Sequence, residues 1–542
     1  MQRLKLFAAM LGCLAVLAGT VFFLSPYAPV VEPVMEIEAV WAIEDARTES
    51  DGPLVTYLEN GGAPLGYDAE ENTFYCTLGL GQGESWPEIH LTAPGAKGAR
   101  LVFVDDYSYD WCADAIREGY AYQILCYTDT EFSYAQIVFT GLPIVTLHAQ
   151  EEIGEADTQV EVSVSSFGHA PVISRGRVHL RGGSSRSYEK RNMKLEFVRS
   201  HSSGRSIVEL PVFGGISALQ MNPMVFDERL IRDRLNWTLY GEMLPAGYDD
   251  GFGKRKMAYA EVFLNDRYEG VYLLMESMSE EDELLKTGTS HVLTDSVYRT
   301  LPIKFVEERP YMLRPDRETA GYELRYAPPG ADGFAALQPY FDMLVEEDDA
   351  AFAGLAAACM DIESVVRYEV LMQMLGMTDN VWNNVYLWAR ADGDGMRYQL
   401  APWDMDMSWG KAWGGQADKL GEELDGWYSF DVADRIIGLN VAGAAELLER
   451  RWEEWKCTVF DTGHLAGLIQ SYYMELNESG ALYRNAMRWG LEPETESYEF
   501  IEFAERRAIA MDEAIRIIRE DCGKVPAFLN NQDRDMKGVP IR

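Results

Sequence analysis

One segment, residues 361–406, constrains its own local structure more tightly than the rest of the chain. Asp361 precedes a run with helical apolar spacing, Gly376 follows it, and the stripe consists of Ile362, Val365, Val366, Leu371, Met374 and Leu375. Asp is favoured at helix N-termini and Gly just beyond helix C-termini, so this pattern predicts a helix between Asp361 and Gly376. A loop with Asp379 and Asn384 comes next.

A hairpin is predicted directly after this loop. A strand from Val385 to Ala389 is followed by the turn residues 392–395 and by a second strand that leads into Pro402-Trp403-Asp404-Met405-Asp406. In a regular hairpin centred on residues 393–394, Asn384 lies roughly opposite Trp403. The Asp379 loop and Asp404 should therefore emerge at the same end of the hairpin.

The side chains that converge there suit a magnesium-nucleotide site. Magnesium takes a few hard oxygen ligands together with substrate phosphates. Asp379 and Asn384 also have the D-x-x-x-x-N spacing of a kinase catalytic loop, in which Asp orients the attacking hydroxyl and Asn binds metal. An Asp-x-Asp pair alone is common in solvated turns, but here it is combined with the hairpin. We expect Asp379, Asn384, Asp404 and Asp406 to form one site.

Charge and length limit the remaining alternatives. The chain has 542 residues, 47% of them hydrophobic and 25% charged, which predicts a globular protein of two or three domains. Asp and Glu outnumber Lys and Arg by 87 to 48, giving a formal net charge of -39. Such a charge repels phosphate backbones, so nucleic acid is excluded as a partner.

The N-terminus predicts contact with a membrane. Leu6 to Leu24 is an uncharged apolar run preceded by Arg3 and Lys5. Its length suffices to span a bilayer, and the positive side places the rest of the chain outside the cytoplasm. We expect residues 1–30 to be an uncleaved signal anchor, or a signal peptide that leaves a secreted protein if it is cleaved.

The remaining sequence predicts an α+β protein. Residues 31–150 contain short aromatic-rich strands broken by turns, which indicates a β-sandwich-like domain. Residues 156–525 have a mixed α/β pattern with a helical C-terminal portion, and residues 526–542 form a polar tail. Further expectations concern local elements: a helix from Asp227 to about Tyr240, a hairpin at 258–275 with its turn at Asn265-Asp266, an irregular insertion at 281–330, and helices near 444–454, 464–474 and 498–519.

Four ordered motifs carry a family resemblance. They are Arg181-Gly182-Gly183-Ser184-Ser185 with Lys190-Arg191-Asn192-Met193-Lys194-Leu195, then Asn265-Asp266-Arg267-Tyr268-Glu269-Gly270-Val271-Tyr272 with Glu276, then the Asp379 to Asn384 loop, and finally Pro402-Trp403-Asp404-Met405-Asp406. From about Val160 to at least Gly410 the chain resembles the spore coat protein H (CotH) kinase family. The sequence lacks G-x-G-x-x-G and D-F-G motifs, as is typical of that group.

The resemblance implies a two-lobed atypical protein kinase, with a β-rich lobe, a helical lobe and ATP between them. It implies Lys190 as a catalytic, phosphate-contacting lysine with Lys194 as the alternate, and ATP binding by Ser184, Ser185 and Glu276. Asp379 would be the catalytic Asp, and Asn384, Asp404 and Asp406 the ligands of Mg²⁺ or Mn²⁺. Glu228, Asp233 and Glu242 are all candidate partners for the lysine.

Three functions follow as alternatives. The first is phosphoryl transfer from ATP to Ser or Thr of a secreted, envelope or spore-coat protein of a bacterium. The second is metal-dependent glycosyl transfer, which also uses Asp-x-Asp but requires neither the Asp379 to Asn384 spacing nor Lys190. The third is a catalytically degenerate surface protein that binds envelope partners, since fold resemblance alone does not establish activity.

Overall fold

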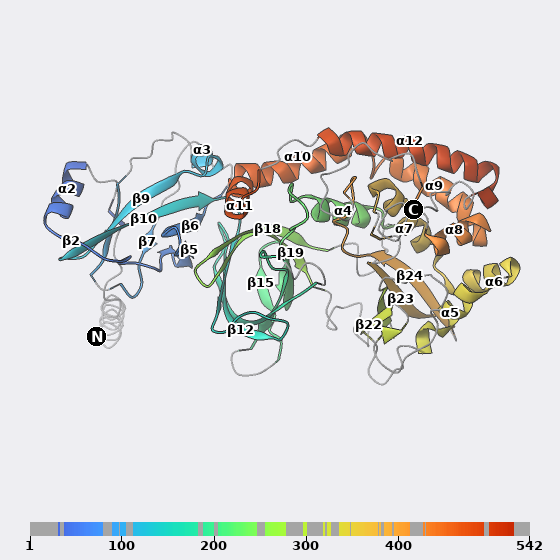
Figure 1. Cartoon of the computed structure of the whole chain (residues 1–542), viewed down its shortest axis with the longest axis horizontal. Coiled ribbons are helices and arrows are strands. Elements are labelled where there is room, and N and C mark those ends of the chain that lie inside the picture. The colour runs from blue at the N-terminus through green and yellow to red at the C-terminus, as the bar shows by residue number, and fades with distance from the viewer. Residues whose placement is uncertain are drawn as a thin grey trace, which may run out of the picture. The chain divides into compact units, whose positions relative to one another are not determined.

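In the computed structural model, whose helices and strands are labelled in Figure 1, the chain forms two compact units. The first contains residues up to 223, 258–274 and 474–492, and the second contains residues 224–257, 275–473 and those from 493 onward. The structure describes residues 31–32, 37–79, 89–96, 98–104, 112–182, 188–199, 204–245, 255–277, 296–300, 318–319, 322–326, 335–346, 348–377, 379–380, 384–392, 395–411, 427–428, 430–492 and 498–524.

A seven-stranded sheet forms the N-terminal part of the first unit. Its strands follow the order β1-β8-β9-β10-β6-β5, and β2 also pairs with β10. The strands are β1 (Val31–Glu32), β2 (Thr48–Glu49), β5 (Gly66–Asp68), β6 (Thr73–Thr77), β8 (Arg100–Phe103), β9 (Ala121–Tyr127) and β10 (Glu131–Thr140). Three pairings, β1 with β8, β2 with β10 and β6 with β10, are parallel.

Alternate residues of each strand face opposite sides of this sheet. Each side packs against other elements. One face shares a core with helix α3 (Cys112–Arg117) and with a small sheet of β3 (Glu59–Asn60), β4 (Ala63–Pro64) and β7 (Leu91–Thr92). The other packs against helix α2 (Ile37–Asp45) through Val40 and Ile43. The region is rich in strands, as predicted, but its parallel pairs and helices differ from an antiparallel sandwich.

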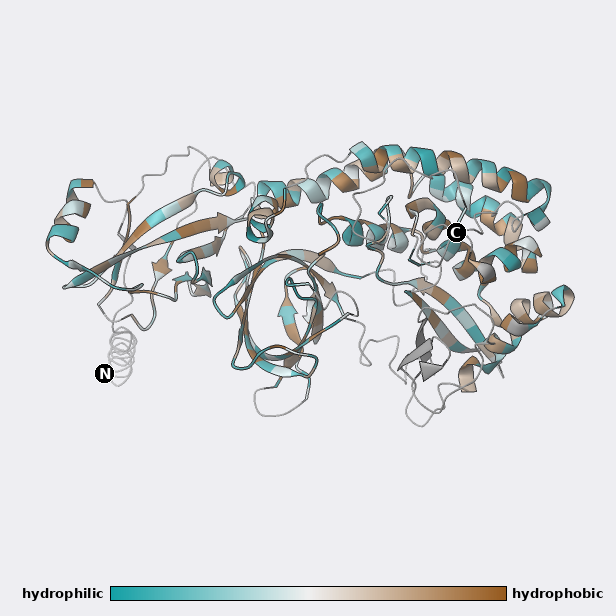
Figure 2. Cartoon of the chain, viewed as in Figure 1, coloured by the Kyte–Doolittle hydropathy of each residue, from teal (hydrophilic) through white to brown (hydrophobic). Residues whose placement is uncertain are grey.

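The first unit also contains a closed barrel (Figure 2). Its strands, in barrel order, are β11 (Ile144–Ala149), β12 (Thr158–Ser165), β13 (Val172–Leu180), β14 (Met193–Val198), β17 (Ala218–Asn222), β19 (Tyr268–Glu276) and β18 (Met257–Leu264). The parallel pairing of β11 with β18 closes it. Strand β11 is thus a barrel strand, although sequence pattern alone groups it with the N-terminal strands. A short ribbon of β15 (Val208–Leu210) and β16 (Gly214–Ile216) adds residues to the same core.

Residues of β14 alternate between the two faces of the strand. Met193, Leu195 and Phe197 belong to the buried barrel core, whereas Lys194 lies between them on the other face. The predicted hairpin of β18 and β19 is confirmed. Its turn residues Asn265 and Asp266 have φ values of 51° and 59°, the positive values that a type I′ turn requires.

The second unit combines helices with a five-stranded sheet (Figure 1). The sheet order is β21 (Glu318–Thr319), β22 (Tyr322–Tyr326), β20 (Ser296–Thr300), β23 (Val385–Asp392) and β24 (Gly395–Pro402). The prediction of an irregular insertion at 281–330 is wrong for β20 to β22, because β20 pairs with β23 and β22 pairs with β20. Cross-strand pairing thus builds regular strands in a stretch whose turn-forming residues suggest none.

The second unit also contains helices. They are α4 (Arg232–Glu242), α5 (Gln338–Val345), α6 (Asp349–Cys359), α7 (Ile362–Leu375), α8 (Asp431–Gly438), α9 (Ala444–Lys456), most of α10 (Thr462–Glu478) and α12 (Tyr498–Glu520). Helix α11 (Ala481–Trp489) belongs to the first unit and has no counterpart among the predicted helices. Hydrophobic and hydrophilic residues alternate along α9 and α12, as amphipathic helices require (Figure 2).

The predicted start of α7 is confirmed, whereas α4 starts later than predicted. Asp361 caps α7 as predicted, since its side chain accepts the backbone N–H of Ser364 at 3.1 Å. Helix α4 begins later than predicted, at Arg232. Asp227 still serves its N-terminus, because its carboxylate accepts the N–H of Arg232 at 2.7 Å and pairs with the Arg232 guanidinium.

The predicted membrane anchor at Leu6 to Leu24 lies outside the described residues. Within the described part of the chain, every helix is too short or too polar to cross a bilayer.

Candidate active site

The end of helix α7 places the Asp379 loop. Gly376 has a φ of 61°, and a Cβ atom there would lie 2.9 Å from Cζ of Phe503 on α12. Both the left-handed backbone and the close ring favour glycine at this position. Asp379 therefore follows a sharply defined helix end.

The hairpin register brings the two predicted loops together. Val385 pairs with Pro402, and the Trp403 N–H donates to the Asn384 carbonyl at 2.8 Å. Asn384 and Trp403 are thus neighbours across the hairpin, as the sequence predicts, and Asp404 comes directly after. Asn384 and Asp404 both have positive φ, 55° and 53°. Non-glycine residues in this conformation often occur at functional sites, where the surroundings hold the strain.

Asn384 also contacts Asp379 directly. Its Nδ2 donates to Asp379 Oδ2 at 2.6 Å. The side-chain oxygen of Asn384 is the hard donor atom that a metal ion would take. The first and last residues of the predicted D-x-x-x-x-N loop therefore lie in contact.

Asn380 joins the two loops and was not predicted as a site residue. Its Nδ2 donates to the carbonyl oxygens of Asn384, at 3.2 Å, and Trp403, at 2.8 Å. The hydroxyl of Tyr368 on α7 donates to the Asn380 carbonyl at 2.6 Å. Asn380 thereby fixes the backbone on both sides of the site.

Asp406 lies in a concentration of negative charge. Burial raises its pKa well above the usual value, and the nearby carboxylates of Asp404, Asp233, Asp379 and Asp227 raise it further. Asp404 is exposed, whereas Asp233, on α4, is buried. Asp233 is a second residue that the sequence did not assign to this site. A cation there would be attracted by all of these carboxylates.

The donor set fits a hard divalent cation with open positions. Among the described residues, no three His, Cys, Asp or Glu side chains are arranged as a metal site by themselves. The predicted set of one carboxamide and two carboxylates supplies oxygen atoms only. Magnesium sites that also bind phosphates use few protein ligands of this type and keep positions for water and substrate.

The predicted nucleotide-binding lysines form hydrogen bonds and ion pairs with protein groups of the first unit. Lys190, in the first unit, is buried, and its Nζ donates to the Val271 carbonyl at 2.6 Å and to Asn485 Oδ1 at 2.9 Å. Lys194, on β14, forms an ion pair of 2.8 Å with Glu196. Ser184 and Ser185 lie outside the described residues.

Glu276 and the candidate lysine partners lie in the second unit. Glu276 ends β19, and its Oε2 accepts the Lys256 N–H at 3.0 Å. Glu228 pairs with Lys411 at 2.6 Å and Glu242 with His464 at 2.7 Å. Asp233, one of the three acids considered as lysine partners, is close enough to Asp406 to raise its pKa.

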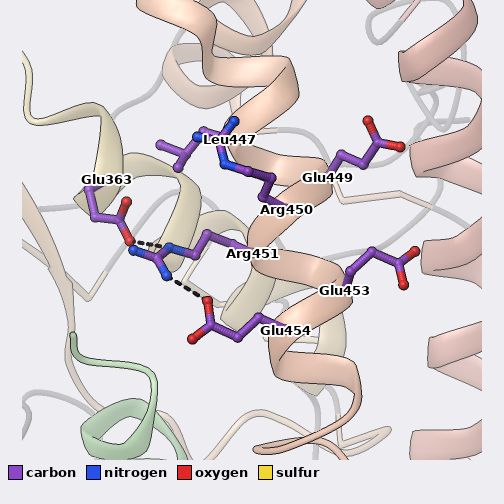
Figure 3. A pocket seen from close by; sticks show the side chains of 7 residues that line it. All are labelled: Glu363, Leu447, Glu449, Arg450, Arg451, Glu453 and Glu454. Atoms are coloured by element: carbon purple, nitrogen blue, oxygen red, sulfur yellow. Dashed lines mark hydrogen bonds and ion pairs between the residues drawn. The ribbon is translucent and has the colours of Figure 1, made fainter. Parts of the chain in front are cut away.

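A surface hollow lies elsewhere in the second unit, between α9 and the start of α7 (Figure 3). Its described lining consists of Glu363, Leu447, Glu449, Arg450, Arg451, Glu453 and Glu454. Arg451 bonds to Glu363 at 2.7 Å and to Glu454 at 2.6 Å, so two of the acids are already paired. The predicted site residues are not part of this lining.

Comparison with known proteins agrees with the motifs. The family described as CotH kinase protein matches residues 178–511, which is more than half of the chain. The matched range includes Lys190, the β18–β19 hairpin and both acidic loops. No curated protein matches the chain. The chain therefore belongs to the CotH kinase protein family.

Proposed function

We propose that this protein is an atypical protein kinase that transfers a phosphoryl group from ATP to Ser or Thr of another protein. One observation carries the proposal. The β23–β24 register sets the contacting pair Asp379 and Asn384 beside the loop of Asp404 and Asp406. Membership of the CotH kinase protein family supports the same reaction class.

Each residue has a role in this proposal. Asn384, Asp404 and Asp406 would hold Mg²⁺, or Mn²⁺, which when bound supplies charge neutralisation for the phosphates. Asp379 orients the acceptor hydroxyl and takes its proton as the oxygen attacks phosphorus. The bond from Asn384 Nδ2 keeps the Asp379 carboxylate in one orientation. Asn380 holds both loop backbones while the substrate binds.

The nucleotide contacts are also part of the proposal. Lys190 remains the first candidate for the phosphate-contacting lysine and Lys194 the alternate, with Ser184, Ser185 and Glu276 as further ATP contacts. Lys194 lies in a cationic group, because Arg177 and Arg205 also pair with Glu196, at 2.8 and 3.1 Å. Asp157 also pairs with Arg177, at 3.5 Å, so three cations lie beside two carboxylates, and the remaining positive charge favours a phosphate.

The acceptor is expected outside the cytoplasm. This follows from the predicted anchor or signal peptide, and the resemblance to the spore coat protein H family implies a secreted, envelope or spore-coat protein as substrate. Glycosyl transfer and simple partner binding are distinguished from phosphoryl transfer by the experiments that follow.

Replacing the acidic residues tests the proposal. The intact protein is incubated with Mg²⁺ or Mn²⁺, labelled ATP and a protein acceptor. We expect Asp404→Asn and Asp379→Asn each to lower label transfer by at least about a hundredfold, since the effects of general base and charge stabilisation are of this order. Asp512→Asn, at a partly exposed ion pair between α9 and α12, is the control and should retain transfer. Unchanged transfer by Asp404→Asn would show that the assigned mechanism is wrong.

Ligand binding separates the alternatives. Thermal unfolding with ATP and with nucleotide sugars identifies the donor, because the true ligand raises the midpoint most. Stabilisation by nucleotide sugars alone would favour glycosyl transfer, and stabilisation by neither would favour a binding protein. Calorimetry with Lys190→Met and Lys194→Met then identifies the lysine: the variant that loses ATP binding had the phosphate contact.

A further inference from the structure

A buried asparagine on helix α4 holds the loop that carries Asp404 and Asp406. Asn236 is fully buried, and its Nδ2 donates to the Met405 carbonyl at 2.7 Å and to Ser408 Oγ at 2.8 Å. Its Oδ1 accepts the indole N–H of Trp409 at 2.7 Å. One carboxamide therefore binds three successive parts of the loop, and Met405 lies directly between the two acidic residues.

The loop adds bonds of its own around these contacts. Ser408 Oγ donates to the Met405 carbonyl at 2.7 Å, and the Ser408 N–H donates to the Asp406 carbonyl at 3.0 Å. The Trp409 N–H reaches the Leu375 carbonyl at the end of α7, at 2.7 Å. Trp409 also has a φ of 55°, so this tight path is held in a strained conformation. Both sides of Asp406 are thereby fixed.

Helix α4 and the residues before it also contact the chain on either side of residues 405–409. The rings of Trp237 and Trp403 meet edge to face with centroids 6.2 Å apart. Just before the helix, Glu228 pairs with Lys411 at 2.6 Å. The segment from 403 to 411 therefore rests on α4 and the residues before it.

Burial of the Asn236 carboxamide costs free energy unless its hydrogen bonds are made inside the protein. An apolar side chain would fill the same space without that cost. What it would not supply is two donors and one acceptor for the Met405 carbonyl, Ser408 and Trp409. The bonds of Asn236 are thus specific to the backbone path of the acidic loop.

We propose that Asn236 is a positioning residue of the active site. It sets the path of residues 405–409 and so directs Asp404 and Asp406 toward the Asp379 loop. The inference rests on the proposed function, because positioning matters here only if these acids bind a metal ion. It also makes the placement of α4 a determinant of metal affinity.

Metal binding by the intact protein tests this inference. Mn²⁺ is the probe, and its dissociation constant is measured by calorimetry for wild type and for Asn236→Leu, which fills the space without the polar atoms. We expect at least about tenfold weaker binding, the usual consequence of removing a group that orients metal ligands. In activity assays the Mn²⁺ concentration for half-maximal rate should rise by the same factor. A role limited to stability would leave both values unchanged.

A matched control separates positioning from stability. Trp452 is also fully buried in the second unit, and its indole N–H donates to Asp512 at 2.8 Å. Trp452→Phe removes that half-buried bond and should lower the thermal midpoint without changing the Mn²⁺ affinity. If Asn236→Leu binds Mn²⁺ as tightly as Trp452→Phe does, Asn236 has no positioning role.

A milder variant keeps the inference testable if Asn236→Leu does not fold. Ser408→Ala removes one of the three groups that Asn236 binds and should weaken Mn²⁺ binding a fewfold. Unchanged affinity in folded Ser408→Ala would then overturn the inference. Failure of the wild type itself to bind Mn²⁺ would instead contradict the proposed function.

Discussion

Lys190 shows how strongly surroundings change the chemistry of one residue. Its ammonium group has two hydrogen-bond acceptors, Val271 and Asn485, and lies 5.0 Å from the ring centre of Tyr272. Burial lowers its pKa from 10.5 to about 7, although the charge of Glu269 opposes the shift. Lysine is usually exposed, so composition alone gives no sign of this environment.

The lowered pKa of Lys190 predicts a specific pH dependence. Between about pH 7 and pH 10.5 the unfolded chain keeps a proton on Lys190 that the folded chain has lost, so the contribution of this residue to stability rises with pH across that window. The slope is at most about 1.4 kcal/mol per pH unit. We expect the difference in unfolding free energy between wild type and Lys190→Met to shift in favour of wild type from pH 7 to pH 10. Equal pH dependence of the two proteins would contradict this assignment.

Gly270, in the Asn265 to Tyr272 motif, has a structural requirement of its own. Its φ is 83°, and a Cβ atom would lie 2.4 Å from Asn485 Oδ1, the atom that accepts bonds from Lys190 and the Val271 N–H. The Asn485 side chain can come this close to the backbone because Gly270 has no side chain. The motif thus builds the contact between the hairpin and α11, in addition to any part it has in ATP binding.

Replacing Gly270 measures this contact, and Gly62 provides a matched control. Gly62 has a φ of 86°, and a Cβ atom there would meet nothing within 4 Å. Gly62→Ala should cost only the backbone strain, about 1–2 kcal/mol. Gly270→Ala should cost about 1–3 kcal/mol more, because Asn485 must move and lose hydrogen bonds. Urea unfolding monitored by tryptophan fluorescence gives both values, and equal losses would show that the contact contributes little.

Helix α7 contains a buried acid that the proposed reaction does not use. Glu369 is fully buried and receives a bond of 2.7 Å from Gln373 on the next turn. Burial raises its pKa well above 4.5, and the nearby Asp434 raises it further. Because the folded pKa exceeds the unfolded value, the stabilising contribution is complete below about pH 4.5 and is lost as the pH rises through the folded pKa.

Because the folded pKa of Glu369 is raised, we expect Glu369→Gln to stabilise the protein at neutral pH. The substitution keeps the shape and the acceptor for Gln373 but removes the charge. We expect a gain of about 1–3 kcal/mol at pH 7.5, the range for a buried polar group that lacks a partner, and little change near pH 4.5. Glu505→Gln, at an exposed position on α12, should change neither value. Thermal unfolding at both pH values provides the measurement, and a loss at pH 7.5 would reveal a stabilising role for the charge.

Local elements were predictable where one segment contains all the necessary information. Helix α7 has its cap, apolar stripe and terminal glycine within one stretch, and the β23–β24 register follows from the turn between the strands. Strands β20 and β22 depend on cross-strand partners, and turn-forming residues around them concealed the pattern. Helix α11 is a short segment between two glycines, so its periodicity gave little signal.

The placement of the candidate site residues along the chain was predictable only in part. The pairing that sets Asn384 opposite Trp403, directly before Asp404, follows from hairpin geometry. The contribution of α4 was not predictable, because Asn236 and Met405 are separated by 169 positions and a bond from a side chain to a distant backbone carbonyl leaves no pattern in the sequence. Asn380 was missed for a related reason: Asn in a loop is common, and its backbone contacts appear only in three dimensions.

At the scale of the whole molecule, the net charge and the fold class were easier to predict than the closure of the barrel. The negative charge and the α+β class are properties of composition and pattern. The barrel depends on β11 meeting β18, whose residues Ile144 and Glu261 pair across a long stretch of chain. Such a parallel contact between distant strands is not specified by either strand alone.

The division of the chain has a consequence for how this protein is made. The first unit takes residues 258–274 and 474–492 in addition to the N-terminal stretch, and the second begins before the first is complete. During synthesis the ribosome must pass Glu276 before all the barrel strands exist, and Trp489 before the whole of α11 exists. Nascent chains halted at residue 223 should therefore expose unpaired strand edges, which are targets for chaperones and proteases.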